Sequence, residues 1–516
     1  KERDQGIAVA EITRMMTPGQ DPDQTHAEVV QRHVSALIDL AVHGLDAKER
    51  DLAQELLKLI PISTKGGDVR RAFELLVRIG EFTPDENIFV RRAGVRNRFS
   101  AEVLEAADSA ADLAAEGPAP RDATELLTLA IDDARTTEVD DAFAIEGERL
   151  YVFIADVAAF VPAGGVLDEE AQRRVSTVYL AEGKIPMLPS VLSEGAASLE
   201  QGVTRRALCF SGEMSDDGRL LGLEVEEVFC RVDRRLTYVE TDEILERKES
   251  ADEVERLVQK AGAWLKLHRE RRAMVGALLL QRNEIDLRVG DDGQVTVSPV
   301  NANGPARQMI SEMMVATCAA VGSWCYDQQV PCVYRAQAAP DDARNMDGGE
   351  VSDTMDQHRV LRRLKPSTLT TRPQGHYTLG VSGYTQVTSP LRRYQDLVMH
   401  QQLKSYLRRR RPRFTDRDLM GIFQSVDRGA AAVRRAASET HRFWMLRYLE
   451  QNADKQWRAL AVRPIGRRWL VELLDLVFTV PMTHGTPFVE GQELVVEVGE
   501  VDARRDHLSL RLVSAV

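Results

Sequence analysis

Several features that define other protein classes are absent from this sequence of 516 residues. It has five cysteines and no Cys-x-x-Cys pair, which excludes a dense disulfide framework and the common zinc motifs. No stretch approaches the ~20 apolar residues of a membrane-spanning helix. The chain opens Lys-Glu-Arg, without the apolar run of a signal peptide. We therefore expect a soluble, monomeric protein of the reducing cytoplasm that has no contact with a membrane.

The cysteines show one regularity. Cys318, Cys325 and Cys332 recur every seven residues, a spacing that is compatible with a ligand-binding face. Free cysteines are among the most frequently buried residues, where they act as small apolar side chains. We therefore expect these three to be buried.

An overall excess of basic residues is also missing. The net charge of −13, taken alone, disfavours nucleic-acid binding, because phosphate contacts require Lys and Arg. Between residues 391 and 450, however, fourteen Lys and Arg stand against six Asp and Glu, a local excess of +8. This window contains the run Arg408 to Arg411, followed by Arg413. The run is typical of a solvated helix end, and it is equally compatible with a positive surface that guides RNA.

The residues that are present predict an α+β protein of several domains, in line with ~150 residues per domain. Residues 1–100 have helical periodicity. Residues 101–119 are rich in Ala, Glu and Pro and are expected to form a linker. Residues 120–455 form a long mixed α/β region, and residues 456–516 are β-rich.

Within the first hundred residues, apolar positions follow a period near 3.6 over residues 26–60 and 68–79. Residues 81–83 and 88–90 then alternate as in a short hairpin. The order of helix, turn, helix and hairpin is that of a winged helix-turn-helix. General helical packing is the alternative, and a winged-helix transcription factor with a large appendage is a further one.

The most informative segment is an acidic loop. The apolar run at residues 126–131 leads into the first acid, and strand-like sequence resumes near Phe143. Carboxylates crowded in this way repel one another unless cations neutralise them, and oxygen-rich sites suit magnesium or manganese. The alternative is a solvated acidic loop. The four acids are Asp132, Glu138, Asp140 and Asp141.

The order of these acids resembles the signature of the ribonuclease II (RNB) catalytic domain. The similarity spans roughly residues 120 to 455. Further matching blocks are Ile154–Val157, Leu167–Asp168, Tyr179–Leu180, Ile185–Pro189, Leu192–Ser193, Glu312–Met314, Tyr334–Arg335 and Tyr384–Tyr394 (YTQVTSPLRRY), with Asp396 and His400 after them.

This resemblance implies a hydrolytic 3′-to-5′ exoribonuclease that degrades single-stranded RNA to nucleoside 5′-monophosphates. The four acids would hold magnesium or manganese, and Asp140 would be the least replaceable. Arg392 would grip the terminal phosphates and stabilise developing charge, and Tyr179 would stack on a terminal base. A surface ion pair for Arg392 and a core position for Tyr179 are the alternatives.

The sequence departs from the family pattern at several positions. Glu138 replaces the usual Asp, Gln337 the usual His, and Gln386-Val387 the usual His-Phe. These changes favour a second hypothesis, namely an RNA-binding or regulatory protein with impaired catalysis.

The two ends of the chain also bear on the resemblance. Family members usually carry cold-shock domains before the catalytic domain, whereas residues 1–100 are expected to be helical. Residues 456–516 resemble the end of an OB-fold RNA-binding domain of the ribosomal protein S-one type, with strands predicted over 491–498 and 508–510. A purely structural barrel is the alternative.

Overall fold

The computed structural model describes residues 2–17, 19–62, 66–112, 120–250, 252–343, 348–485 and 487–515. The chain divides into two compact units. The first comprises residues 1–96, 289–294 and 432–443, and the second comprises residues 97–288, 295–431 and 444–516.

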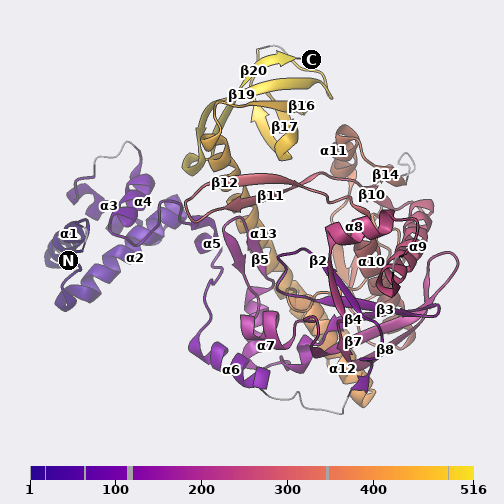
Figure 1. Cartoon of the computed structure of the whole chain (residues 1–516). Helices are drawn as coiled ribbons and strands as arrows, with labels where there is room; N and C mark the ends of the chain where they lie inside the picture. Colours follow the sequence, from indigo (N-terminus) through magenta and orange to yellow (C-terminus); the bar gives the residue numbers. More distant parts are fainter. Residues whose placement is uncertain are drawn as a thin grey trace. The chain divides into compact units, whose positions relative to one another are not determined.

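The first unit is helical, as predicted (Figure 1). Its core contains Leu37, Leu56 and Leu75, none of which is exposed to solvent. These residues come from three different helices, whose apolar faces therefore stabilise one another. The helices are α1 (Glu2–Met15), α2 (Ala27–His43), α3 (Arg50–Leu59), α4 (Asp68–Arg78) and α5 (Ile88–Arg92).

The predicted hairpin of the winged helix is wrong. Ile88–Arg92 is helix α5, and no strand forms within residues 2–17, 19–62 and 66–100. The cause is local, because the Asn87 side chain accepts hydrogen bonds from the amides of Phe89 and Val90 and so caps a helix. An alternating segment of three residues is too short to override such a cap.

The second unit is built on a seven-stranded sheet in the order β1-β8-β7-β4-β3-β2-β9. The middle segments of its central strands are apolar, and Phe143, Phe153 and Phe210 on three of these strands are fully buried. The strands are β1 (Arg121–Asp122), β2 (Leu129–Asp132), β3 (Asp141–Glu146), β4 (Arg149–Ala155), β7 (Thr204–Met214), β8 (Leu220–Arg231) and β9 (Arg234–Thr237).

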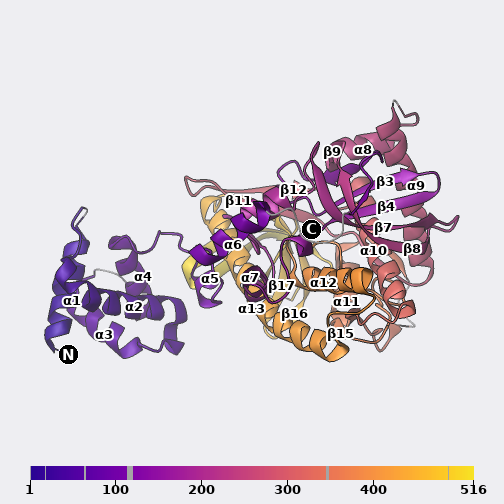
Figure 2. The same cartoon turned by 90° about the horizontal axis from the view of Figure 1, so that it is seen from below.

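The second unit also contains helices and short strand pairs, and Figures 1 and 2 show α9 and α10 lying side by side against the sheet. The helices are α7 (Val166–Arg174), α8 (Tyr238–Glu246), α9 (Glu253–Met274), α10 (Pro305–Asp327), α11 (Thr354–Arg363), α12 (Tyr394–Arg409) and α13 (Asp416–Gln451). The strand pairs are β5 (Val178–Leu180) with β6 (Gly183–Ile185), β10 (Leu278–Leu280) with β14 (Gly349–Val351), β11 (Glu284–Val289) with β12 (Val295–Val300), and β13 (Tyr334–Ala336) with β15 (Thr368–Thr370).

The predicted linker over residues 101–119 is wrong for its first part. Helix α6 (Ala101–Asp112) occupies residues 101–112, and its Val103 and Ala107 belong to the core of the second unit. Alanine has the highest helix propensity, so an Ala-rich segment favours a helix wherever it meets an apolar surface. Residues 113–119 lie outside the described residues.

The C-terminal segment forms a five-stranded antiparallel sheet in the order β18-β17-β16-β19-β20. The first strand therefore pairs with both the second and the fourth, the connectivity expected of an OB fold. The strands are β16 (Gln456–Ile465), β17 (Arg468–Leu473), β18 (Phe478–Met482), β19 (Glu493–Asp502) and β20 (His507–Ala515).

The cysteines and the apolar content of the described helices agree with the expectations from composition. All five cysteines are unpaired and buried, so the predicted burial of Cys318, Cys325 and Cys332 is confirmed. Among the described residues, no helix has the length and apolar character needed to cross a bilayer. The α+β multidomain class is the one observed.

Candidate functional site

The acidic loop connects β2 to β3 at one end of the large sheet. β2 ends with Asp132 and β3 begins with Asp141, so two of the predicted acids stand at strand ends. Arg235, on the neighbouring strand β9, donates hydrogen bonds to the backbone oxygens of Asp133 (3.0 Å) and Thr136 (2.6 Å). The loop is therefore tied to the sheet at both of its ends and in its middle.

The four predicted acids line one cavity of about 570 Å³. Tyr179 and Arg392 line the same cavity. The structure thus gathers around one space all six residues that the sequence singled out, although they are separated by up to 260 positions along the chain.

Asp140 is the most tightly held of the acids. It is buried, and its Oδ1 accepts a hydrogen bond from the amide of Leu391 at 3.0 Å. Its Oδ2 accepts one from Nε of Arg392 at 3.1 Å. The Arg392 side chain is 43% exposed and also donates to the Ser389 hydroxyl. Arg392 is therefore not an isolated surface ion pair, since it reaches from the cavity to a buried carboxylate.

Side chains of helix α12 hold the segment that carries Arg392. Asp396 is fully buried and accepts hydrogen bonds from the Ser389 amide (2.9 Å) and from Nη2 of Arg393 (2.7 Å). The ring of His400 contacts the Val387 oxygen at 2.6 Å. The matched block before α12 thus acts as a scaffold that presents the Leu391 amide and Arg392.

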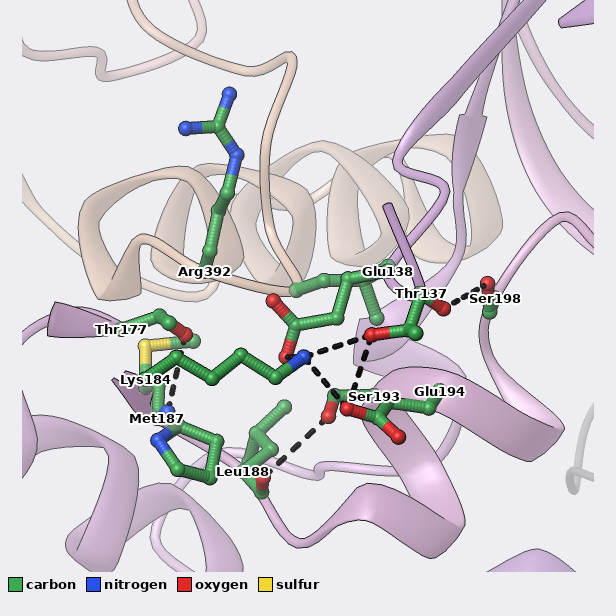
Figure 3. Close-up of polar contacts among 12 residues, drawn as sticks. Thr137, Glu138, Thr177, Lys184, Met187, Leu188, Ser193, Glu194, Ser198 and Arg392 are labelled. Carbon is green, nitrogen blue, oxygen red and sulfur yellow. Dashed lines mark hydrogen bonds and ion pairs between the residues drawn. The ribbon is translucent and has the colours of Figure 1, made fainter. Parts of the chain in front are cut away.

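Glu138 is held from the hairpin of β5 and β6. Its Oε2 accepts a hydrogen bond from the Tyr179 hydroxyl at 3.2 Å, and Nζ of Lys184 lies 3.4 Å from its Oε1. Figure 3 shows the Lys184 ammonium reaching Glu138, Thr137 and Glu194 together. Tyr179 is 56% exposed, so the alternative that placed it in the core is wrong.

Burial dominates the electrostatics of the acids. It raises the pKa of Asp140 to about 7, against the opposing effect of Arg392. It also raises the pKa of Asp132 to about 7, opposed by Arg235 and assisted by Asp140. For Asp141 burial and the charge of Asp132 act together, again to raise the pKa to about 7. A compact set of carboxylates that resists ionisation is stabilised by nearby positive charge.

The donor set fits a hard divalent cation in its chemistry, because every candidate ligand atom is a carboxylate oxygen. The Oε1 atom of Glu138 is buried and accepts no hydrogen bond; its charged neighbour is the Lys184 ammonium at 3.4 Å. Within the described part of the chain, no three His, Cys, Asp or Glu side chains are gathered as metal ligands. Both oxygens of Asp140 are instead engaged by Leu391 and Arg392.

The departures at Gln337 and Gln386 lie outside this cavity. The Gln337 amide group donates to the Lys365 oxygen at 2.8 Å and accepts from the Thr378 amide at 2.9 Å. Gln386 accepts from Nε of Arg335 at 3.1 Å. Both glutamines have structural partners, so neither changes the acidic centre directly.

Some residues at the site were not found from the sequence. Lys184 directly precedes the matched block Ile185–Pro189 and Glu194 directly follows the matched block Leu192–Ser193, and Arg235, which binds the loop backbone, is one of two consecutive arginines. Tyr238 and Arg307 also line the cavity, with the Arg307 guanidinium 4.1 Å from the Tyr238 ring centre. Their roles depend on which strands and helices become neighbours, and local sequence patterns carry no signal for that.

Comparison with known proteins agrees with the sequence resemblance. The family model described as RNB domain matches residues 120–409. An uncharacterised ribonuclease of Synechocystis sp. is 29% identical over 476 residues, which cover 89% of this chain and 70% of that protein. Ribonuclease R of Thermotoga maritima is 26% identical, over 74% of this chain. The chain spans only 56% of the length of this second relative.

Solved structures show the same fold. The Dss1 exoribonuclease of Candida glabrata superposes with a TM-score of 0.78 and 17% identity, covering 99% of this chain and 70% of its own. Ribonuclease R of Mycoplasma genitalium, bound to ribose-methylated single-stranded RNA, has a TM-score of 0.72 and 19% identity, covering 83% and 77%. Yeast Ssd1, described as a pseudonuclease, has a TM-score of 0.60 and 14% identity, covering 81% and 58%.

The two hydrogen bonds from Arg235 lead to a test of how the acidic loop is held. We predict that Arg235→Met makes the amides of residues 133–137 exchange with deuterium at least about tenfold faster, because each bond from a charged donor is worth ~1.5–3 kcal/mol. The matched control is Arg234→Met, an exposed neighbour on the same strand. Equal exchange in the two variants would show that the loop holds its shape without Arg235.

Proposed function

Because the chain belongs to the RNB domain family, we propose that it is a hydrolytic exoribonuclease that degrades single-stranded RNA from the 3′ end to nucleoside 5′-monophosphates. The reaction is proposed to require magnesium, or manganese in its place. The observation that carries the proposal is the convergence of Asp140, Arg392 and Tyr179 on one acidic cavity. The predicted family is confirmed by the domain match, and the names of the relatives agree with an RNB-type ribonuclease.

The residues at the cavity are proposed to have different roles. Asp132, Glu138, Asp140 and Asp141 would hold the cation, which when bound supplies a nucleophilic water and neutralises phosphate charge. Arg392 binds phosphate oxygens with the N–H groups that it does not use on Asp140 and Ser389, as guanidinium groups do in a planar fork. The Leu391 amide keeps the Asp140 carboxylate in a fixed orientation.

Tyr179 provides the contact to the base in this proposal. Its ring is more than half exposed while its hydroxyl is anchored to Glu138 at 3.2 Å. An exposed ring held at its polar end is suited to base stacking, which tolerates every base and contributes ~1–3 kcal/mol per base. Selectivity for RNA over DNA then requires contacts to the 2′-hydroxyl.

RNA binding without cleavage is a second candidate function. One observation favours it: the oxygens of Asp140 are both hydrogen-bonded within the protein, and Glu138 contacts Tyr179 and Lys184. The retention of all four acids favours the enzyme. The two functions differ in whether a 5′-labelled RNA becomes shorter when the protein and magnesium are added, and whether EDTA stops the reaction.

The sharpest test of the enzyme is Asp140→Asn, which keeps the shape of the side chain and removes its charge. We expect single-turnover cleavage to fall at least about a hundredfold, the scale seen when an electrostatic stabiliser is lost. RNA affinity should be kept or should rise, because repulsion from the acids falls. The matched control is Asp133→Asn on the same loop, whose side chain is 64% exposed and pairs with Arg307. Near-normal cleavage by Asp140→Asn would contradict the catalytic assignment.

Base stacking is tested by two substitutions of Tyr179. We predict that Tyr179→Ala leaves cleavage intact but lengthens the shortest product, because the last few nucleotides are held less tightly. Tyr179→Phe keeps the ring and loses the bond to Glu138, so its shortest product should be unchanged. Both ladders are read on a denaturing gel, and identical ladders for Ala and the unsubstituted chain would remove the stacking role.

The C-terminal sheet is proposed to bind RNA at a distance from the cavity. OB folds use the loops after the first and fourth strands for this purpose. Here Arg467 lies in the first of these loops, with Arg468 directly after it at the start of β17, and Arg504 and Arg505 lie in the second. We predict that Arg467→Gln with Arg468→Gln weakens binding of a long RNA. The slope of log affinity against log salt should fall by about 1.4, since each phosphate that is no longer neutralised accounts for ~0.7.

The control for this pair is Arg511→Gln on β20, which faces Glu497 at 3.3 Å. Cleavage at saturating RNA should be unaffected in all of these variants. If the double variant and Arg511→Gln bind RNA with the same salt dependence as the unsubstituted chain, the barrel is structural.

A further inference from the structure

Lys184 lies at the middle of β6, directly opposite Tyr179 on β5. Residues directly opposite each other in an antiparallel pair project from the same face. Both side chains accordingly reach one carboxylate, with Tyr179 at Oε2 of Glu138 and Lys184 at Oε1. The hairpin therefore holds Glu138 by both of its oxygens, one through a hydroxyl and one through a charge.

The ammonium of Lys184 is fixed by two further partners (Figure 3). It lies 2.5 Å from Oε1 of Glu194 and donates to the Thr137 hydroxyl at 2.8 Å. Thr137 in turn donates to the same Glu194 oxygen at 3.0 Å. An ammonium has three donors. Two are used here, and the third faces Glu138 across 3.4 Å.

Glu138 depends on this charge. Its side chain is 3% exposed, and Oε1 accepts no hydrogen bond. A buried carboxylate with an unsatisfied oxygen is costly unless an opposite charge is close. Lys184 supplies that charge, and its contacts with Glu194 and Thr137 hold the ammonium beside Glu138.

We infer that Lys184 is a positioning residue that holds Glu138 and acts as a fixed positive charge competing with a divalent cation for this carboxylate. The inference rests on the proposed function, because it assumes that the acidic cavity binds a cation. It assigns to Lys184 and Glu194 a role in setting how tightly the centre binds metal. Glu138, with its longer side chain, is the acid through which they act.

The experiment measures the affinity for Mn²⁺ alone, without RNA, from the paramagnetic resonance signal of the free ion. Lys184→Met removes one unit of positive charge from the wall of the cavity, so Mn²⁺ should bind roughly tenfold more tightly. Lys184→Arg keeps the charge and should bind nearly as the unsubstituted chain does. Unchanged or weaker binding by Lys184→Met overturns the inference.

Adding Glu138→Gln shows whether Lys184 acts through its ion pair with Glu138 or only through the electrostatic potential of the whole cavity. In the Lys184→Met background this second change should abolish the tenfold gain, because the released carboxylate is the source of that gain. Arg307→Met is the matched control, since Arg307 lines the same cavity but pairs with Asp133. There Glu138→Gln should have the same effect as in the unsubstituted chain. Equal effects in the two backgrounds contradict the pairing.

Glu194→Gln provides an independent check if Lys184→Met does not fold. Without the Glu194 charge, Lys184 should pair more strongly with Glu138, so Mn²⁺ should bind several-fold more weakly. Unchanged binding contradicts the inference. A chain that binds Mn²⁺ and cleaves RNA, but shows no effect of these variants, removes this inference alone. A chain that binds no Mn²⁺ and cleaves no RNA removes the proposed function as well.

Discussion

The crowding of four carboxylates into one partly buried cavity is the constraint on which the rest of the site depends. Burial is the main cause that raises the pKa of Asp132, Asp140 and Asp141 to about 7. Neighbouring acids oppose ionisation further, since like charges repel at short range. A fold that places such a set together must therefore also place cations and donors around it. The positive residues of the cavity are the counterpart of its acids.

These counter-charges come from separate parts of the chain. Of the positive residues that line the cavity, Lys184 is on β6, Arg307 on α10 and Arg392 on the segment before α12. Arg235, on β9, is not part of the cavity lining but binds the backbone of the acidic loop. Each also makes a contact that orients the backbone or another side chain, as Arg235 does with the Asp133 and Thr136 oxygens. The same residues therefore reduce repulsion and set geometry. This arrangement explains why one loop can carry all four acids without losing its shape.

The sequence predicted that the acids, Arg392 and Tyr179 belong to one site, because each lies in a short motif and the order of these motifs along the chain is typical of the family. Strand β2 ending at Asp132 was equally predictable, since an apolar run leads into it. Lys184 and Glu194 were not, because their meeting depends on the register of β5 with β6 and on the packing of residues 191–196. The predicted hairpin near residue 88 was wrong because the Asn87 cap favours a helix there. The predicted linker from residue 101 was wrong because its alanines favour a helix.

Glu138 shows how a departure from a family pattern is accommodated. Its additional methylene group, compared with Asp, extends the carboxylate to the Tyr179 hydroxyl and to Lys184. One carboxylate then connects the proposed base-stacking ring, the fixed ammonium and the proposed cation site. Where one partner changes the affinity for another, linkage requires the coupling to be reciprocal. Under the proposed function, base binding at Tyr179 and cation binding at the acids therefore depend on each other through Glu138.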